Sequence, residues 1–208
     1  MHNDMPPEAI GKAYDTITHL WQSERFNLNN GIDAHKKALQ FVKSNTGQAL
    51  DVGCGCTGRF ANLLQGAGYR YTGLDVSEKK IELARTQSPS HDFIHADICQ
   101  WQPQAQYDFI TAWDSIWHIP LQQQQPVLEK LSHSLKPNGV FIFSCGGTDE
   151  PGEHTDDYMG PAVYYSSLGV NGFWKVFADI ENCHIKHFEF DQPPELHSYF
   201  IVQKGENI

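Results

Sequence analysis

A glycine-rich turn and a carboxylate that follows it are the residues of this chain best suited to bind a ligand. Gly53, Gly55 and Gly58 follow the apolar run 49–52, and Asp75 ends the next apolar run. Glycines let the main chain approach a ligand closely, and the helix after such a turn presents unpaired N–H groups. A carboxylate at the end of the second strand can accept hydrogen bonds from both hydroxyls of a ribose. The pattern predicts a site for a nucleoside-containing cofactor.

Two further acids bear on which cofactor the turn binds. A Gly-x-Gly-x-x-Gly turn followed by an acid suits NAD as well as S-adenosylmethionine. Asp51 lies within the first strand, where a dinucleotide-binding strand stays apolar beneath the pyrophosphate. An acid there suits a ligand with ammonium and sulfonium groups. Asp97 follows the third strand, and its side chain and the adjacent N–H can bind the edge of an adenine. Both acids favour S-adenosylmethionine.

The elements that position these residues alternate between short apolar runs and amphipathic segments. A parallel sheet with helices on both faces is the fold that such alternation implies. The turn Lys136-Pro-Asn-Gly139 precedes the fifth run, and a short linker joins two terminal strands that therefore pair antiparallel. We predict an α/β fold with a Rossmann-like doubly wound sheet, mostly parallel, with an antiparallel terminal strand. The expected strands are 49–52, 69–74, 92–95, 107–113, 140–144, 184–190 and 197–204.

Two segments interrupt the alternation and set the expected domain boundaries. Residues 1–46 are predicted to be an N-terminal helical segment that covers the site, and residues 47–208 the Rossmann-like domain. Residues 146–172 are rich in Gly, Pro and acids and are expected to form a loop insertion. Long loops of this kind serve as lids or binding loops, and a solvated surface is the alternative.

Taken together, the motifs resemble those of the class I S-adenosylmethionine-dependent methyltransferases. Leu50-Asp-Val-Gly-Cys-Gly55 is similar to the first motif of the family, Gly73-Leu-Asp-Val-Ser77 to the second, and His95-Ala-Asp-Ile98 to its adenine-contact motif. The resemblance covers roughly residues 48–144 well and the terminal strands loosely. Many relatives have Thr-Gly directly after the second glycine, so Cys56 is an added residue here.

The resemblance implies a contact with S-adenosyl-L-methionine for each motif residue. Asp51 would help to hold the amino group, Asp75 would take the ribose hydroxyls, and Val76 would flank the adenine. The glycines and Trp113 would border the methionyl part. The full set of implied cofactor contacts is Asp51, Gly53, Gly55, Asp75, Val76, Asp97, Ile98 and Trp113.

Purely structural roles remain open for four of these residues. Asp51 could accept hydrogen bonds from loop amides, and Asp97 could cap the next turn. Asp75 could be an ordinary acid at a strand end, and Trp113 is large enough to be plain core.

The segment after the fourth strand, residues 113–120, is where the resemblance places a methyl acceptor. His118 is the candidate general base there because imidazole titrates near neutral pH; simple packing is the alternative. The acceptor-binding candidates are Trp21, Trp117, Tyr164 and Tyr165. Five acids within 146–172 hint at a cationic acceptor, although such a run is usually a solvated face.

Composition narrows the class of acceptor. The chain has 208 residues and a formal net charge of -10, with 15 Lys and Arg against 25 Asp and Glu, which disfavours a nucleic-acid substrate. The signature of amino methylation on bases, Asn/Asp-Pro-Pro-Tyr/Phe, is absent after the fourth strand. We therefore predict a methyltransferase that acts on a small molecule, with its oligomeric state undetermined.

The sequence also predicts the cellular location of the protein and whether it binds a metal. No run of about 18 apolar residues is present, so no membrane span is expected. The N-terminus lacks the basic and apolar regions of a signal peptide, and the five cysteines show no disulfide framework, so we expect a cytoplasmic protein. Cys54-x-Cys56 lacks zinc-site spacing, and no metal is expected there.

Three other functions remain open at this point. The chain could bind S-adenosylmethionine without turnover, as a regulatory or partner-binding module. It could be an NAD-type oxidoreductase, although Asp51 speaks against that. It could also be a metal-dependent O-methyltransferase that uses Asp114, for which the sequence shows no partner.

Overall fold

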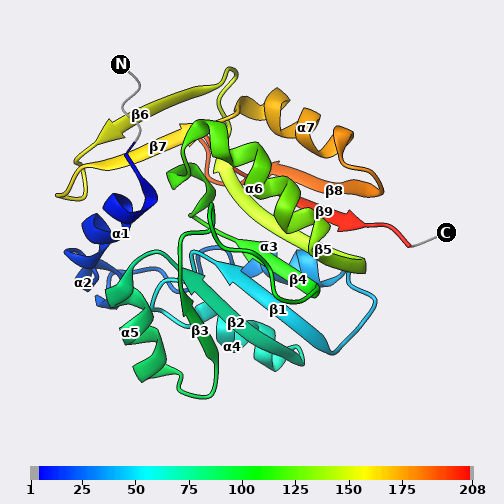
Figure 1. The fold of residues 1–208 in the computed structure, drawn as a ribbon, viewed down its shortest axis with the longest axis horizontal. Helices are drawn as coiled ribbons and strands as arrows, with labels where there is room; N and C mark the ends of the chain where they lie inside the picture. The colour runs from blue at the N-terminus through cyan, green and yellow to red at the C-terminus, as the bar shows by residue number, and fades with distance from the viewer. Residues whose placement is uncertain (1–4, 207–208) are drawn as a thin grey trace.

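The computed structural model describes residues 5–206, which fold around one seven-stranded sheet (Figure 1). The strand order is β3-β2-β1-β4-β5-β9-β8, with β1 to β5 parallel, β9 antiparallel to β5, and β8 antiparallel to β9. This confirms the predicted doubly wound sheet and its antiparallel terminal strand. The strands are β1 Gly47–Val52, β2 Tyr69–Asp75, β3 Asp92–His95, β4 Tyr107–Ala112, β5 Leu135–Gly146, β8 Cys183–Phe190 and β9 His197–Lys204.

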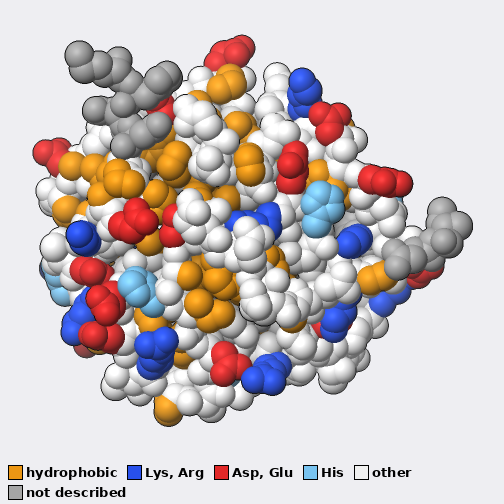
Figure 2. All heavy atoms as spheres, in the orientation of Figure 1, with side chains coloured by type: hydrophobic (Ala, Val, Ile, Leu, Met, Phe, Trp, Pro, Cys, Tyr) orange, Lys and Arg blue, Asp and Glu red, His pale blue; other side chains and the backbone are white. Residues whose placement is uncertain are grey.

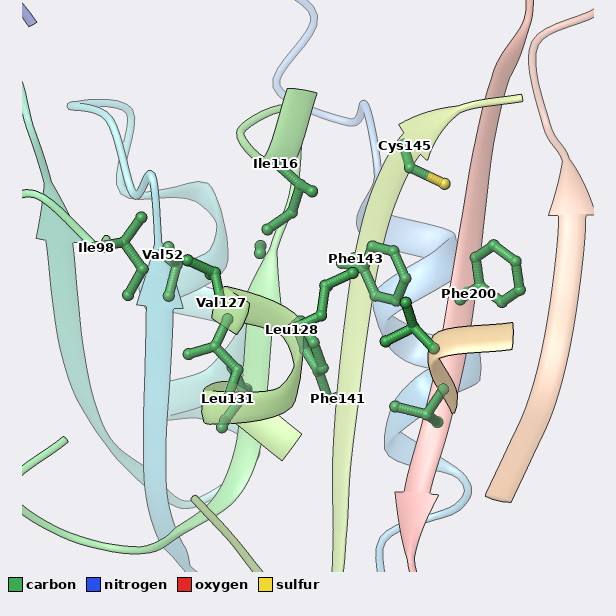
Figure 3. Close-up of a cluster of buried hydrophobic side chains, with 14 of the residues drawn as sticks. Val52, Ile98, Ile116, Val127, Leu128, Leu131, Phe141, Phe143, Cys145 and Phe200 are labelled. Atoms are coloured by element: carbon green, nitrogen blue, oxygen red, sulfur yellow. The ribbon is translucent and has the colours of Figure 1, made fainter. Parts of the chain in front are cut away.

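Helices cover both faces of this sheet because alternate strand residues point to opposite sides. Leu50 and Phe141 belong to a core cluster packed under α6 and α7, and Figure 3 shows part of it. Their neighbours Ala49 and Ile142 belong to a second cluster, under α3 and α4. The helices are α1 Pro7–Asp15, α2 His19–Gln22, α3 Ile32–Leu39, α4 Arg59–Gly66, α5 Glu78–Gln87, α6 Leu121–His133 and α7 Gly169–Asp179, with a 3-10 turn at Ile116–His118. Within the part of the chain that is described, every helix is too short or too polar to span a bilayer.

The segment 146–172 contains a β-hairpin, so the prediction that it forms a loop was wrong. Strands β6 Gly152–Asp156 and β7 Val163–Ser167 pair antiparallel as a separate two-stranded sheet. Much of β6 is exposed, and its sequence is polar. The strand therefore does not appear as an apolar run. Val163 packs with α1, and hydrophobic side chains gather on the face that carries α1 and the hairpin (Figure 2).

Two hydrogen bonds that Asp15 accepts hold α1 against the start of α5. The Asp15 carboxylate accepts from Ser77 Oγ at 2.5 Å and from the Lys79 N–H at 3.0 Å. Gly11 makes the approach possible, since a Cβ there would lie 2.4 Å from the carbonyl oxygen of Val76. Ser77 also caps α5 by accepting from the Lys80 N–H. α1 is therefore held beside the start of α5, next to the carboxyl end of β2.

His35 makes the stability of this fold depend on pH. The ring is fully buried, donates from Nδ1 to the Gly31 carbonyl at 2.7 Å, and accepts the Thr111 hydroxyl at Nε2, also at 2.7 Å. Burial lowers the pKa of His35 to about 3, well below that of an unfolded histidine near 6.5. The unfolded chain therefore takes up a proton first, and the free energy of unfolding falls as the pH drops from about 6.5 toward 3.

We predict that His35→Gln reduces this slope. Glutamine cannot titrate, so the variant should lose up to about 1.4 kcal/mol per pH unit of the dependence measured by urea unfolding between pH 8 and pH 5. The exposed His184→Gln is the matched control and should leave the slope unchanged. The slope rather than the absolute stability is the readout, and equal slopes for wild type and His35→Gln would contradict the prediction.

Candidate functional site

A cavity of about 450 Å³ opens at the carboxyl ends of β1, β2 and β4. Adjacent parallel strands lead to helices in opposite directions from this point, which is where α/β sheets commonly bind ligands. Residues of α1 and α2 form the wall opposite the sheet, and Met159 and Tyr165 of the hairpin segment complete it. All of the predicted site residues line the cavity except Asp51 and Tyr164.

Asp75 organises the glycine turn. Its Oδ2 accepts the N–H of Gly55 at 2.8 Å, and its Oδ1 accepts the N–H of Ser77 at 2.8 Å. Each oxygen keeps a second lone pair, and the residue lines the cavity. Gly55 has φ +60°, and a Cβ there would meet no atom within 4 Å. A side chain at 55 would thus occupy space that is open to a ligand.

Asp97 and Trp113 each have a structural role and also line the cavity. Asp97 accepts the Cys99 N–H at 2.8 Å, so it does cap the next turn, and it also lines the cavity with Val76 and Ile98. Trp113 is only 2% exposed and belongs to the core under α3 and α4, yet it too forms part of the wall.

Strand alternation turns Asp51 and Tyr164 away from the cavity. Asp51 is buried in the sheet, where it accepts the Tyr71 hydroxyl at 2.7 Å, and burial raises the pKa of Asp51 to about 7. The Tyr164 hydroxyl donates to Glu153 at 2.7 Å, while its strand neighbour Tyr165 faces the cavity. The side chains of Asp51 and Tyr164 therefore do not reach the cavity that the other predicted residues line.

His118 is held as a neutral imidazole with one nitrogen available as an acceptor. Its Nδ1 donates to the Tyr164 carbonyl at 2.9 Å, since a carbonyl can only accept. Its Nε2 therefore accepts, from the Tyr14 hydroxyl at 2.7 Å and from Trp117 Nε1 at 3.1 Å. Desolvation of the ring lowers the pKa of His118 to about 4, so the ring is uncharged at neutral pH. Sequence reasoning missed Tyr14, which lies 104 positions away on α1.

Arg59 is a second residue that sequence reasoning missed. It begins α4 directly after the glycine turn, and its guanidinium lies between the rings of Phe26 and Phe60, 5.1 and 4.6 Å from their centroids. One nitrogen, Nη2, is 3.6 Å from Asp114 Oδ2. The other, Nη1, is buried and has no hydrogen-bond partner among residues 5–206. A cationic donor left unpaired in a cavity wall suits an anionic group of a ligand.

Asp114 joins Arg59 to a partly buried chain of alternating charges. Its carboxylate accepts from His197 Nε2 at 3.1 Å and from Asn30 at 3.1 Å, and His197 Nδ1 lies 2.5 Å from Asp191. Burial alone would lower the pKa of His197, but the hydrogen bonds to the two carboxylates outweigh it and raise that pKa. Across the described part of the chain, no group of three or more His, Cys, Asp or Glu side chains is placed to hold a metal ion.

Known proteins similar to this chain are methyltransferases. Residues 49–139 match the family described as a methyltransferase domain. Ubiquinone biosynthesis O-methyltransferase of Aromatoleum aromaticum is 24% identical, over 96% of this chain and 82% of that protein. Trans-aconitate 2-methyltransferase of Paracidovorax citrulli is 29% identical, over 78% of this chain and 69% of that protein.

Solved structures show the same fold. Magnesium protoporphyrin IX methyltransferase from Synechocystis PCC 6803, with bound S-adenosylmethionine, superposes with a TM-score of 0.71 at 15% identity, covering 99% of this chain and 100% of that one. An S-adenosylmethionine-dependent methyltransferase from Mesorhizobium loti gives 0.69 at 18% identity, covering 86% and 100%.

The buried Asp51 yields a prediction about stability. Its folded pKa of about 7 lies above its unfolded value near 3.8, so its contribution to stability is lost as the pH rises from about 4 to 7. Asp51→Asn keeps an acceptor for Tyr71 and removes the charge. We expect it to raise the free energy of unfolding at pH 8 by on the order of 1–4 kcal/mol, with a smaller gain at pH 4.

Urea unfolding of the ligand-free protein at both pH values measures this change. Asp92→Asn, at a carboxylate whose side chain is 56% exposed, is the control and should give no comparable gain. A loss of stability at pH 8 in Asp51→Asn would show that the buried carboxylate is ionised and stabilising.

Proposed function

Because this chain belongs to the class I S-adenosylmethionine-dependent methyltransferases, we propose that it transfers the methyl group of S-adenosyl-L-methionine to a small molecule bound in the cavity. The observation that carries the proposal is the hydrogen bond between Gly55 N–H and Asp75, which sets bare main chain and a carboxylate side by side in the cavity. The excess of acidic over basic residues disfavours a nucleic-acid acceptor. The names of the relatives include small acceptors such as trans-aconitate, which supports a small molecule.

The residues present fit the adenosyl part of the cofactor. Asp75 would accept the two ribose hydroxyls with the lone pairs that the backbone N–H groups leave free. Val76 and Ile98 would hold the adenine between them, and Asp97 would accept its amino group. The open space at Gly55 leaves room for a ligand against the turn.

The residues also fit the methionyl part. Gly53 and Trp113 line the cavity next to the glycine turn, where the sulfonium would lie. Nη1 of Arg59, which has no partner within residues 5–206, is suited to the carboxylate of that part, because a guanidinium donates strong hydrogen bonds to carboxylates. Asp51 lies behind the wall and would act on the amino group only from a distance.

The bound cofactor supplies a methyl group already activated on sulfur, so the chain has mainly to align the acceptor and remove its proton. The Tyr14 hydroxyl donates to His118 Nε2, and its oxygen can at the same time accept a proton from an acceptor hydroxyl. The acceptor proton would pass to Tyr14 as the Tyr14 proton passes to Nε2, which leaves the tyrosine neutral. His118 is thus the proposed base, and Tyr14 the proposed link to it.

Cofactor binding tests the first half of the proposal. Asp75→Ala removes the acceptor of the ribose hydroxyls, so S-adenosylhomocysteine should bind more weakly by about 1–3 kcal/mol, or roughly 5- to 150-fold, in isothermal titration calorimetry. Asp92→Ala removes an exposed carboxylate and should bind as wild type does. Unchanged affinity in Asp75→Ala would refute the placement of the ribose.

Turnover tests the second half. With an acceptor found by screening small molecules against methyl-labelled cofactor, His118→Ala should lower kcat by about 10²–10⁴-fold, the usual range for a general base. Tyr14→Phe keeps the ring but loses the hydroxyl, so it should also slow turnover. The affinity for S-adenosylhomocysteine should stay near wild type in both variants.

The losses should be similar at pH 6 and pH 8, because His118 is neutral at both. Full activity of both variants would remove His118 and Tyr14 from the reaction. Binding of S-adenosylhomocysteine with no transfer to any acceptor would instead favour a binding module without turnover.

A further inference from the structure

Lys80 presents a buried ammonium group to the cavity. It lies in the first turn of α5, is 7% exposed, and lines the cavity beside Asp75. Its Nζ is 3.9 Å from the ring centroid of Tyr14 and 4.0 Å from that of Trp21. Within residues 5–206, this Nζ makes neither a hydrogen bond nor an ion pair, so none of its three N–H donors has an oxygen or nitrogen acceptor there.

The neighbouring acids do not serve as its partners. Asp75 uses its oxygens on the N–H groups of Gly55 and Ser77, and Asp15 uses Oδ1 on Ser77 Oγ and the Lys79 N–H. Both acids act on the Lys80 charge only through space. The two aromatic rings stabilise the cation, but a ring face cannot accept directed hydrogen bonds as an oxygen does. A buried ammonium with unused donors is costly unless a ligand supplies an anion.

The cavity holds a second cation, and the position of each indicates a different ligand group. Arg59 follows the glycine turn, where the methionyl carboxylate of the cofactor is proposed to lie. Lys80 lies instead at the helical cap, against Tyr14, whose hydroxyl reaches His118. A ligand group bound at Lys80 is therefore separated from the proposed base, His118, by the ring of Tyr14. It lies on the side of the cavity where the acceptor is proposed to bind.

We propose, on the basis of the proposed methyltransferase function, that Lys80 binds a carboxylate of the methyl acceptor, and that the acceptor is an anion with an apolar or aromatic frame. A single ammonium matches the single charge of a carboxylate, and the Tyr14 and Trp21 rings match an apolar frame. The acids of 146–172 suggested a cationic acceptor, but none of them lines the cavity. The methionyl carboxylate of the cofactor is the other carboxylate that would fit Lys80, and the experiment below distinguishes it from a carboxylate of the acceptor.

The test compares three probes that share one ring and differ in charge: benzoate, benzyl alcohol and benzylamine. Each is titrated into the full-length protein saturated with S-adenosylhomocysteine, and binding is followed by proton NMR of the probe. Benzoate should bind roughly tenfold more tightly than benzyl alcohol, as expected for one charge-assisted hydrogen bond, and benzylamine most weakly.

Substitutions then assign the preference to Lys80. Lys80→Met keeps an apolar side chain of similar length and should reduce the preference for benzoate over benzyl alcohol to near onefold, whereas Lys80→Arg should retain it. Lys79→Met is the matched control, because the neighbouring Lys79 side chain is 52% exposed and pairs with Glu82. The wild-type ranking of the three probes needs no substitution and holds even if a variant folds poorly.

Cofactor analogues separate the two sources of carboxylate. S-adenosylhomocysteine carries the methionyl carboxylate, and 5′-methylthioadenosine lacks it. If Lys80 binds the acceptor, Lys80→Met should change the affinity for both by less than about twofold. A selective loss for S-adenosylhomocysteine would assign Lys80 to the cofactor and overturn the inference.

Two other results would also overturn the inference: wild-type binding of benzyl alcohol or benzylamine as tight as that of benzoate, or a benzoate preference that survives Lys80→Met. Failure of the wild type to bind S-adenosylhomocysteine is a different result. It would refute the proposed function itself, whatever the probes show.

Discussion

The two hydrogen bonds that Asp75 accepts from the main chain are the interaction on which the rest of the site depends. They tie the turn after β1 to the start of α5, because one oxygen takes the Gly55 N–H and the other the Ser77 N–H. Ser77 in turn binds Asp15, and this contact places α1 over the cavity. From α1, Tyr14 reaches both His118 and Lys80. Through these short contacts, one carboxylate at a strand end connects the proposed cofactor side of the cavity with the proposed acceptor side.

Several charged side chains beside the cavity are paired with opposite charges. Asp114 lies between Arg59 and His197, and His197 continues to Asp191, so the charges alternate in sign. Such pairing reduces the cost of removing these groups from water. Among residues 5–206, Nη1 of Arg59 and the ammonium of Lys80 have no hydrogen-bond partner and stand apart from this arrangement. One lies beside the glycine turn and the other under the helical cap, the positions proposed above for the cofactor and for the acceptor.

Much of the fold could be predicted from the sequence because strands that are buried on both faces consist of short apolar runs. Ile142 and its neighbours in β5 read as a strand without any tertiary information. The structure differs at the predicted turn 136–139, because β5 begins at Leu135 and includes those residues, with an irregular register against β4. The hairpin within 146–172 could not be read in this way. Its first strand is polar and largely exposed, so only pairing with β7 and packing of Val163 on α1 define it.

The sequence by itself determined the glycine turn and the strand-end carboxylate of the proposed cofactor side, because local patterns at Gly53, Gly55 and Asp75 encode the turn and the strand end. Only the tertiary structure decided which other side chains face the cavity. Strand alternation turned Asp51 and Tyr164 away, which their identities do not reveal. Tyr14, Arg59 and Lys80 carry no local motif, and their importance arises from burial and from contacts between distant segments. The physical reason is that a side chain's chemistry is local, whereas its desolvation and its partners depend on the packing of the whole chain.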